Sequence, residues 1–230
     1  MDDFQLEWQL ILKEAGISAT GFHMADFVAR KSPFDNWPQD KRDTIIRALI
    51  EVIVKYALAG MATAVFKSAY DKHVKGQLRE KRGHHHYTFA VQSCLGCIEQ
   101  RRHLHADWTP MDYVFDAMSN GKHEIIKLFD DIYDQGLGRH FGVLPNCYSC
   151  GNRRFVIPLQ AADILAWETL KHMKHHELTG KPARKSFQSL AHRMDIYSRF
   201  FEDDSMAAFV ADVTPKYEGR SWNGPLGGFL

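Results

Sequence analysis

The chain has 230 residues, of which 29 are basic and 28 acidic, and 45% are hydrophobic. This length and composition predict one large globular domain with a hydrophobic core, and the balanced charge argues against a general polyanion-binding surface. No apolar run approaches membrane-spanning length, and the N-terminus lacks a signal-peptide pattern. With only four cysteines, which do not suggest a disulfide framework, we expect a soluble cytoplasmic protein that does not contact membranes.

Hydrophobic periodicity predicts an alternation of helices and strands along the chain. The expected helices cover residues 3–15, 38–59, 87–105, 121–133, 158–174, 186–194 and 203–213. The expected strands cover residues 62–66 and 111–115, with shorter ones at 141–144 and 155–157 and a brief strand or turn at 22–28. Strands separated by helices indicate an α/β domain with a partly parallel sheet.

The domain is expected to span residues 1–213, followed by a flexible tail over residues 214–230. The tail contains Pro215, Pro225 and four glycines, and it has few apolar residues with which to order itself. No internal repeat or long linker interrupts the region before it.

Residues 67–86 form the most basic part of the chain. A basic segment of this kind can be a nucleic-acid contact surface or a solvated loop. No periodic aromatic platform for base stacking accompanies it, which favours the solvated loop.

The most informative stretch is the predicted helix that follows Pro158. Proline suits the first turn of a helix, and the residues after it are apolar at helical spacing, with Asp163 as an acidic interruption. Gln160 and Trp167 lie one turn to either side, so they share a face with Asp163. Because an unpaired buried charge is very costly, this carboxylate is expected to be paired, protonated, solvent-exposed at the rim of a cleft, or bound to a metal.

The residues from Ile157 to Trp167 resemble the closing helix of the family called domain of unknown function 3800, which has a ribonuclease H-like fold. Two further stretches, Phe22–Phe27 and Met111–Asp116, agree with the family in order. The resemblance covers the chain from Trp8 to about Lys174. It implies an α/β fold with a ribonuclease H-like mixed sheet flanked by helices, without the opening strand of typical members.

The resemblance also implies a nuclease active site. The last acidic residue of the family's site lies in a Leu-Gln-x-Ala-Asp pattern, which Asp163 matches, and Asp116 at the end of a predicted strand is the expected second acid. Two such carboxylates suit Mg²⁺ or Mn²⁺, which can stabilise attacking and leaving oxygens in phosphodiester hydrolysis. Asp112 or Glu168 is a further candidate ligand.

Typical members supply another acid from an opening strand that reads Asp-Glu-Ser-Gly, and this sequence lacks that motif. We therefore expect a metal-dependent nuclease with little or no activity. The alternative is a non-catalytic module that binds nucleic acid or protein. Without the opening strand, the neighbouring strand is expected to have an unpaired edge. A partner chain or a second copy of this chain could pair with that edge.

Two Cys-x-x-Cys pairs suggest a zinc site. Cys147 and Cys150 lie among turn-forming residues and are the better chelating pair, whereas Cys94 and Cys97 lie in an apolar helix and are expected to be core residues. The gap between the pairs is much longer than in common zinc ribbons. We expect Cys147 and Cys150 to lie close enough to chelate, without the other pair as partners.

Overall fold

The chain divides into two compact units. The computed structural model describes residues 2–17, 21–117, 121–177 and 179–218. Unit 1 comprises residues 1–62 and 151–197, and unit 2 comprises residues 63–150 and 198–230. Whether they together form one ribonuclease H-like domain over residues 1–213 stays a prediction.

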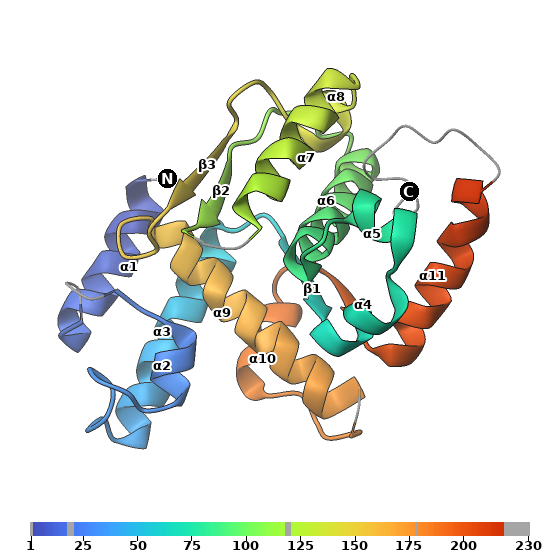
Figure 1. Cartoon of the computed structure of the whole chain (residues 1–230). Helices are drawn as coiled ribbons and strands as arrows, with labels where there is room; N and C mark the ends of the chain where they lie inside the picture. Colours follow the sequence, from blue (N-terminus) through green and yellow to red (C-terminus); the bar gives the residue numbers. More distant parts are fainter. Residues whose placement is uncertain (1, 18–20, 118–120, 178, 219–230) are drawn as a thin grey trace. The chain divides into compact units, whose positions relative to one another are not determined.

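Unit 1 is organised around helix α9, which α1, α2 and α10 each contact (Figure 1). Helix α3 in turn contacts α1 and α10. The buried side chains of Trp8, Leu49, Ile53 and Ile164 belong to one hydrophobic core. The helices of unit 1 are α1 (Asp2–Ala15), α2 (Met24–Val28), α3 (Gln39–Tyr56), α9 (Ile157–His172), its π-helical continuation η1 (Met173–Glu177) and α10 (Lys185–Ala191).

Unit 2 has its own core, which is rich in aromatic side chains. The ring of Phe89 is fully buried and contacts the rings of Tyr70, Phe201 and Phe209 at centroid distances of 5.4, 4.9 and 5.2 Å. The helices of unit 2 are α4 (Lys67–His73), α5 (Gly76–Arg82), α6 (His86–His105), α7 (Lys122–Asp134), α8 (Gly138–Phe141) and α11 (Asp203–Glu218).

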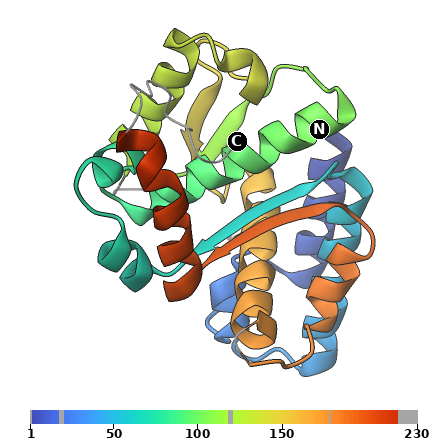
Figure 2. The ribbon, with the colours of Figure 1, turned by 90° about the vertical axis from the view of Figure 1, so that its right-hand side faces the viewer.

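The described strands form two small parallel sheets. Strand β1 (Gly60–Val65) pairs with β4 (Ile196–Phe201), and the two run in the same direction (Figure 2). Strand β2 (Tyr113–Asp116) pairs with β3 (Tyr148–Gly151). In the backbone hydrogen bonds next to each strand pair, the residue numbers of the two partners increase together along the chain, as parallel pairing requires. The α/β class is therefore confirmed, whereas a single ribonuclease H-like sheet stays a prediction.

Most of the predicted helices are confirmed, because long amphipathic segments carry the clearest periodicity. The predicted strands at 62–66 and 111–115 are also confirmed as β1 and β2, within two residues at each end.

Several short segments were predicted wrongly. Residues 22–28 contain helix α2, and residues 67–86 contain helices α4 and α5 instead of a loop. Residues 155–157 are not a strand, because the backbone N–H groups of Phe155 and Val156 donate to the Asn152 carbonyl in a turn that leads into α9. Residues 141–144 end α8 and turn away from it. Strands β3 and β4 were not expected.

The C-terminal helix α11 continues to Glu218, so the first residues of the predicted tail are helical. Residues 219–230 lie outside the described part of the chain. Across the described ranges, no helix combines the length and the apolar character needed to cross a membrane.

Phe89 provides a test of the unit 2 core. We expect Phe89→Ala to lower the free energy of unfolding by about 3–5 kcal/mol, because it removes a buried ring that neighbouring side chains cannot replace. The matched control is Phe155→Ala, since Phe155 is 80% exposed and its loss should change stability by less than about 0.5 kcal/mol. Urea denaturation of both variants checks this, and equal effects would contradict the assigned core.

Candidate functional site on helix α9

Helix α9 begins as the sequence predicts, with Pro158 in its first turn. Asp163 lies in the middle of the helix, and its side chain is 27% exposed. The carboxylate is therefore neither buried without a partner nor fully solvated. Its neighbours on the same helix face explain its position.

Gln160, one turn before Asp163, is fully buried and joins three segments of unit 1. Its Oε1 accepts hydrogen bonds from Trp8 Nε1 at 2.9 Å and from the backbone N–H of Phe22 at 3.0 Å. Its Nε2 donates to the Arg153 carbonyl at 2.8 Å. A Cβ at Gly21 would lie 2.8 Å from this Nε2, so glycine leaves the room that the amide needs.

Asp163 continues this attachment one turn further along α9. Its Oδ2 accepts a 2.7 Å hydrogen bond from the backbone N–H of Met24, the first residue of α2. The residue preceding α2, His23, makes no side-chain cap of its own, so Asp163 supplies a capping acceptor from a distant part of the chain. Within the described residues, Asp163 Oδ1 accepts no hydrogen bond.

His23 lies between two carboxylates. Its Nδ1 donates to Asp26 Oδ2 at 2.7 Å, and its Nε2 lies 3.9 Å from Asp163 Oδ2. The hydrogen bond from His23, with Lys31 also nearby, lowers the pKa of Asp26. Asp26 is therefore ionised at neutral pH. Its bond to Nδ1 of His23 favours the neutral tautomer in which Nε2 carries the lone pair.

A small polar cleft of about 190 Å³ opens beside this histidine. Two arginines and the His23–Asp26 pair give it its charged groups. Its volume suits a phosphate-sized group rather than a whole cofactor. The lining residues are Gly21, Phe22, His23, Asp26, Ser32, Pro33, Phe34, Arg153, Arg154 and Gln160.

The other acids predicted for the site lie elsewhere. Asp116 ends β2 in unit 2, where its Oδ1 accepts the backbone N–H of Ala117 at 3.0 Å. Because Asp116 and Asp163 belong to different units, their convergence on one cation stays a prediction. Asp112 is exposed before β2. Glu168 is fully buried on α9, 3.5 Å from Arg184 Nη2, and serves as a buried ion-pair partner.

Within the described residues of unit 1, Asp163 has too few neighbouring carboxylates to form a two-metal centre. Such a centre needs several carboxylates to hold two cations. Among the described residues of unit 1, no three carboxylate, imidazole or thiolate groups gather closely enough to share an ion. We therefore derive no chemical step through Mg²⁺ or Mn²⁺ at Asp163.

The four cysteines differ in their surroundings, and whether Cys147 and Cys150 lie close enough to chelate stays a prediction. Cys147 is buried before β3 and Cys150 is exposed within it, as expected for residues three apart in extended chain. Cys94 Sγ lies 3.4 Å from Thr63 Oγ1, and burial raises the pKa of Cys94 to about 11. Burial also raises the pKa of Cys97. Among the described residues, no three cysteines gather around a common point, so we do not propose zinc there.

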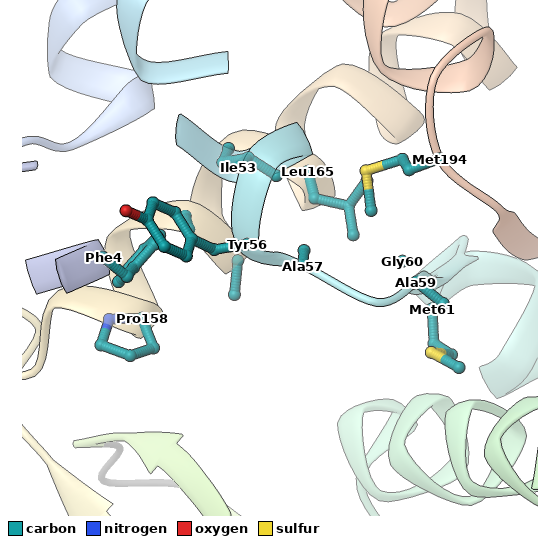
Figure 3. Close-up of a pocket in the computed structure, with 12 residues that line it drawn as sticks. Phe4, Ile53, Tyr56, Ala57, Ala59, Gly60, Met61, Pro158, Leu165 and Met194 are labelled. Carbon is teal, nitrogen blue, oxygen red and sulfur yellow. The ribbon is translucent and has the colours of Figure 1, made fainter. Parts of the chain in front are cut away.

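A larger cavity of about 570 Å³ in unit 1 is almost entirely apolar (Figure 3). The only titratable group in its lining is the phenol of Tyr56, which donates to Glu7 Oε1 at 2.8 Å. This cavity offers a contact surface but no acid–base pair, so we do not assign the chemistry to it. Its lining comprises Phe4, Ile53, Tyr56, Ala57, Ala59, Gly60, Met61, Pro158, Ala161, Ala162, Leu165 and Met194.

The sequence analysis placed Asp163 correctly on the helix that begins near Pro158 but assigned no role to its partners. His23 and Asp26 lie in a stretch noted only for its family resemblance, although their spacing allows the two side chains to meet on one helical turn. The adjacent Arg153 and Arg154 gave no signal, because pairs of basic residues are common on protein surfaces.

Comparison of the chain with protein-family models, curated proteins and solved structures finds no match.

Gln160 provides a test of the attachment to α9. We expect Gln160→Leu to lower the free energy of unfolding by about 2–4 kcal/mol, because it leaves buried polar partners unpaired while nearly preserving volume. The matched control is Gln5→Leu on the exposed face of α1, which should change stability by less than about 0.5 kcal/mol. Chemical denaturation measures both, and a Gln160→Leu protein as stable as wild type would contradict the assigned hydrogen bonds.

Proposed function

We propose that the chain is a nuclease that hydrolyses phosphodiesters of nucleic acid in the cleft beside α9, with His23 as general base. The observation that carries this proposal is the placement of His23 between Asp26 and Asp163 at a cleft that two arginines also line. The metal-dependent version implied by the family resemblance, with Mg²⁺ or Mn²⁺ on Asp116 and Asp163, stays a sequence-based prediction.

The general-base role rests on the orientation of the imidazole. Asp26 accepts a hydrogen bond from the Nδ1–H group of His23. The other ring nitrogen, Nε2, therefore carries the lone pair that can take a proton from an attacking water. As the water oxygen bonds to phosphorus, the bond from phosphorus to the leaving oxygen breaks. The proton taken from water makes the ring cationic until it passes to the leaving oxygen. The Asp163 carboxylate, 3.9 Å from Nε2, stabilises that charge.

The substrate class rests on the charge and size of the cleft. Guanidinium groups bind phosphate oxygens through paired N–H donors, and they stay cationic at all physiological pH values. Arg153 and Arg154 are adjacent in sequence and both line the cleft. A cleft that holds one phosphate group beside the general base His23 suits a nucleic-acid polymer, because the rest of the polymer can remain outside the cleft.

A second candidate function is a non-catalytic module that binds nucleic acid. The hydrogen bonds of Gln160 and Asp163 favour it. Asp163 Oδ2 and the whole Gln160 amide are used to hold residues 22–24 against α9. In that case the acidic residue of the motif is structural, and the arginines bind nucleic acid without cleavage.

Cleavage assays on single- and double-stranded DNA and RNA, with and without Mg²⁺ or Mn²⁺, distinguish the two candidates. We expect wild-type cleavage to fall by about 10²–10⁴ in His23→Gln, because the variant lacks the base that takes a proton from water. Asp163→Asn should also slow cleavage while keeping an oxygen that can cap α2. The matched controls are His192→Gln and Asp35→Asn, both at exposed positions of unit 1.

Binding measurements on the same substrates complete the test. Arg153→Ala combined with Arg154→Ala should weaken binding and reduce its salt dependence, whether or not cleavage occurs. Salt-dependent binding without cleavage establishes the binding module. Wild-type protein that neither binds nor cleaves these nucleic acids contradicts both candidates.

A further inference from the structure

Unit 2 contains a cluster of three metal-ligating side chains that the site on α9 does not use. Glu99 and His103 lie four residues apart on α6, so they project from the same helix face, and His140 lies on α8. These three are the one group of potential ligands in the described chain whose atoms gather closely enough to share an ion.

The distances within the cluster match those around a bound metal ion. Glu99 Oε1 lies 3.3 Å from His140 Nδ1 and 3.7 Å from His103 Nε2, and the two ring nitrogens are 3.4 Å apart. Ligand atoms placed tetrahedrally around Zn²⁺ at its usual bond lengths are about 3.3 Å from one another. Small movements of the side chains would therefore bring all three to a common ion.

Glu99 supplies an independent observation. It is only 5% exposed, and its Oε2 is buried without a hydrogen-bond partner. A buried carboxylate of this kind is costly unless a positive charge compensates it, and burial raises the pKa of Glu99. Its other oxygen, Oε1, faces both histidines, so the carboxylate group is directed into the cluster.

The second helix of the cluster is held in place by buried polar contacts. Arg102, which is buried on α6, donates to the carbonyls of Arg139 at 3.2 Å and Thr109 at 2.6 Å. Tyr113 also donates to the carbonyl of Phe141. These bonds fix the backbone on both sides of His140, so the ligands from α6 and α8 are arranged before a metal binds.

We propose that Glu99, His103 and His140 bind one Zn²⁺ ion. Two imidazole nitrogens and one carboxylate oxygen favour a borderline transition metal over Mg²⁺ or Ca²⁺, which prefer oxygen ligands. Three protein ligands leave the fourth position of a tetrahedral ion for water or another small ligand. The half-exposed side chains of His103 and His140 give the ion access from solvent.

Titration of the chelator-treated full-length chain with Zn²⁺ and Co²⁺ tests this proposal. Calorimetry should give one tight Zn²⁺ site per chain, and Co²⁺ should show the visible absorption of tetrahedral nitrogen–oxygen ligation without a thiolate charge-transfer band. We expect His103→Gln and His140→Gln each to weaken binding beyond the roughly 10–100-fold typical of changes to outer-shell partners. Both side chains are about half exposed, so the loss of either should leave the fold intact.

The matched control is His105→Gln, which removes an exposed histidine from the same helix and should leave affinity unchanged. Circular dichroism confirms that each variant is folded. Absence of a stoichiometric site in the wild type overturns the proposal, as does full binding by both ligand variants. A thiolate band in the Co²⁺ spectrum also overturns it, because the metal would then be on cysteine. Nuclease assays do not enter this test, so its failure leaves the function proposed for unit 1 unaffected.

Discussion

The arrangement of unit 1 depends on a single buried amide. Gln160 has no exposed surface, and its two polar atoms satisfy donors from Trp8 and Phe22 and the carbonyl of Arg153. An amide buried in this way stabilises one arrangement of the chain, because any other arrangement leaves polar atoms without partners. Removal of Gln160 would leave polar groups of three segments without their partner: α1, the entry to α2, and the turn before α9.

The same attachment gives the candidate site its geometry. Phe22 and Met24, on either side of His23, are both bonded to α9 through their backbone N–H groups. The histidine between them is thus presented at the cleft with little freedom of its backbone. Residues of one motif therefore serve two purposes, since Gln160 fixes the backbone and Asp163 both caps α2 and faces the imidazole.

Sequence patterns predicted helix α9 of this site well, but they missed helix α2 and the contacts between the two. The periodicity after Pro158 was sufficient to place α9, and the odd position of Asp163 marked the correct face. The partners of Gln160 lie 138 and 152 residues away along the chain, and no periodic signal connects such positions. Tertiary contacts also convert residues 22–28 into a helix whose capping acceptor comes from Asp163.

The cluster of Glu99, His103 and His140 was likewise only partly visible in the sequence. The four-residue spacing of Glu99 and His103 is visible in the sequence, but His140 joins them only because Arg102 and Tyr113 hold the short helix α8 in place. The cysteine pairs gave a stronger motif signal than this cluster, yet burial raises the pKa of both cysteines on α6, and no third ligand gathers with either pair in the described residues. A motif with familiar spacing is thus less informative than the burial of its members.

Residue-resolved amide hydrogen exchange tests the central claim most directly, because the claim is that α9 side chains hold the backbone on both sides of His23. In the wild-type protein, the amides of Phe22 and Met24 should exchange slowly. Gln160→Leu should accelerate exchange at Phe22, Asp163→Ala should accelerate it at Met24, and Asp163→Asn should leave Met24 protected because the amide oxygen still accepts its N–H. Rapid exchange at both amides in the folded wild-type protein would contradict the account.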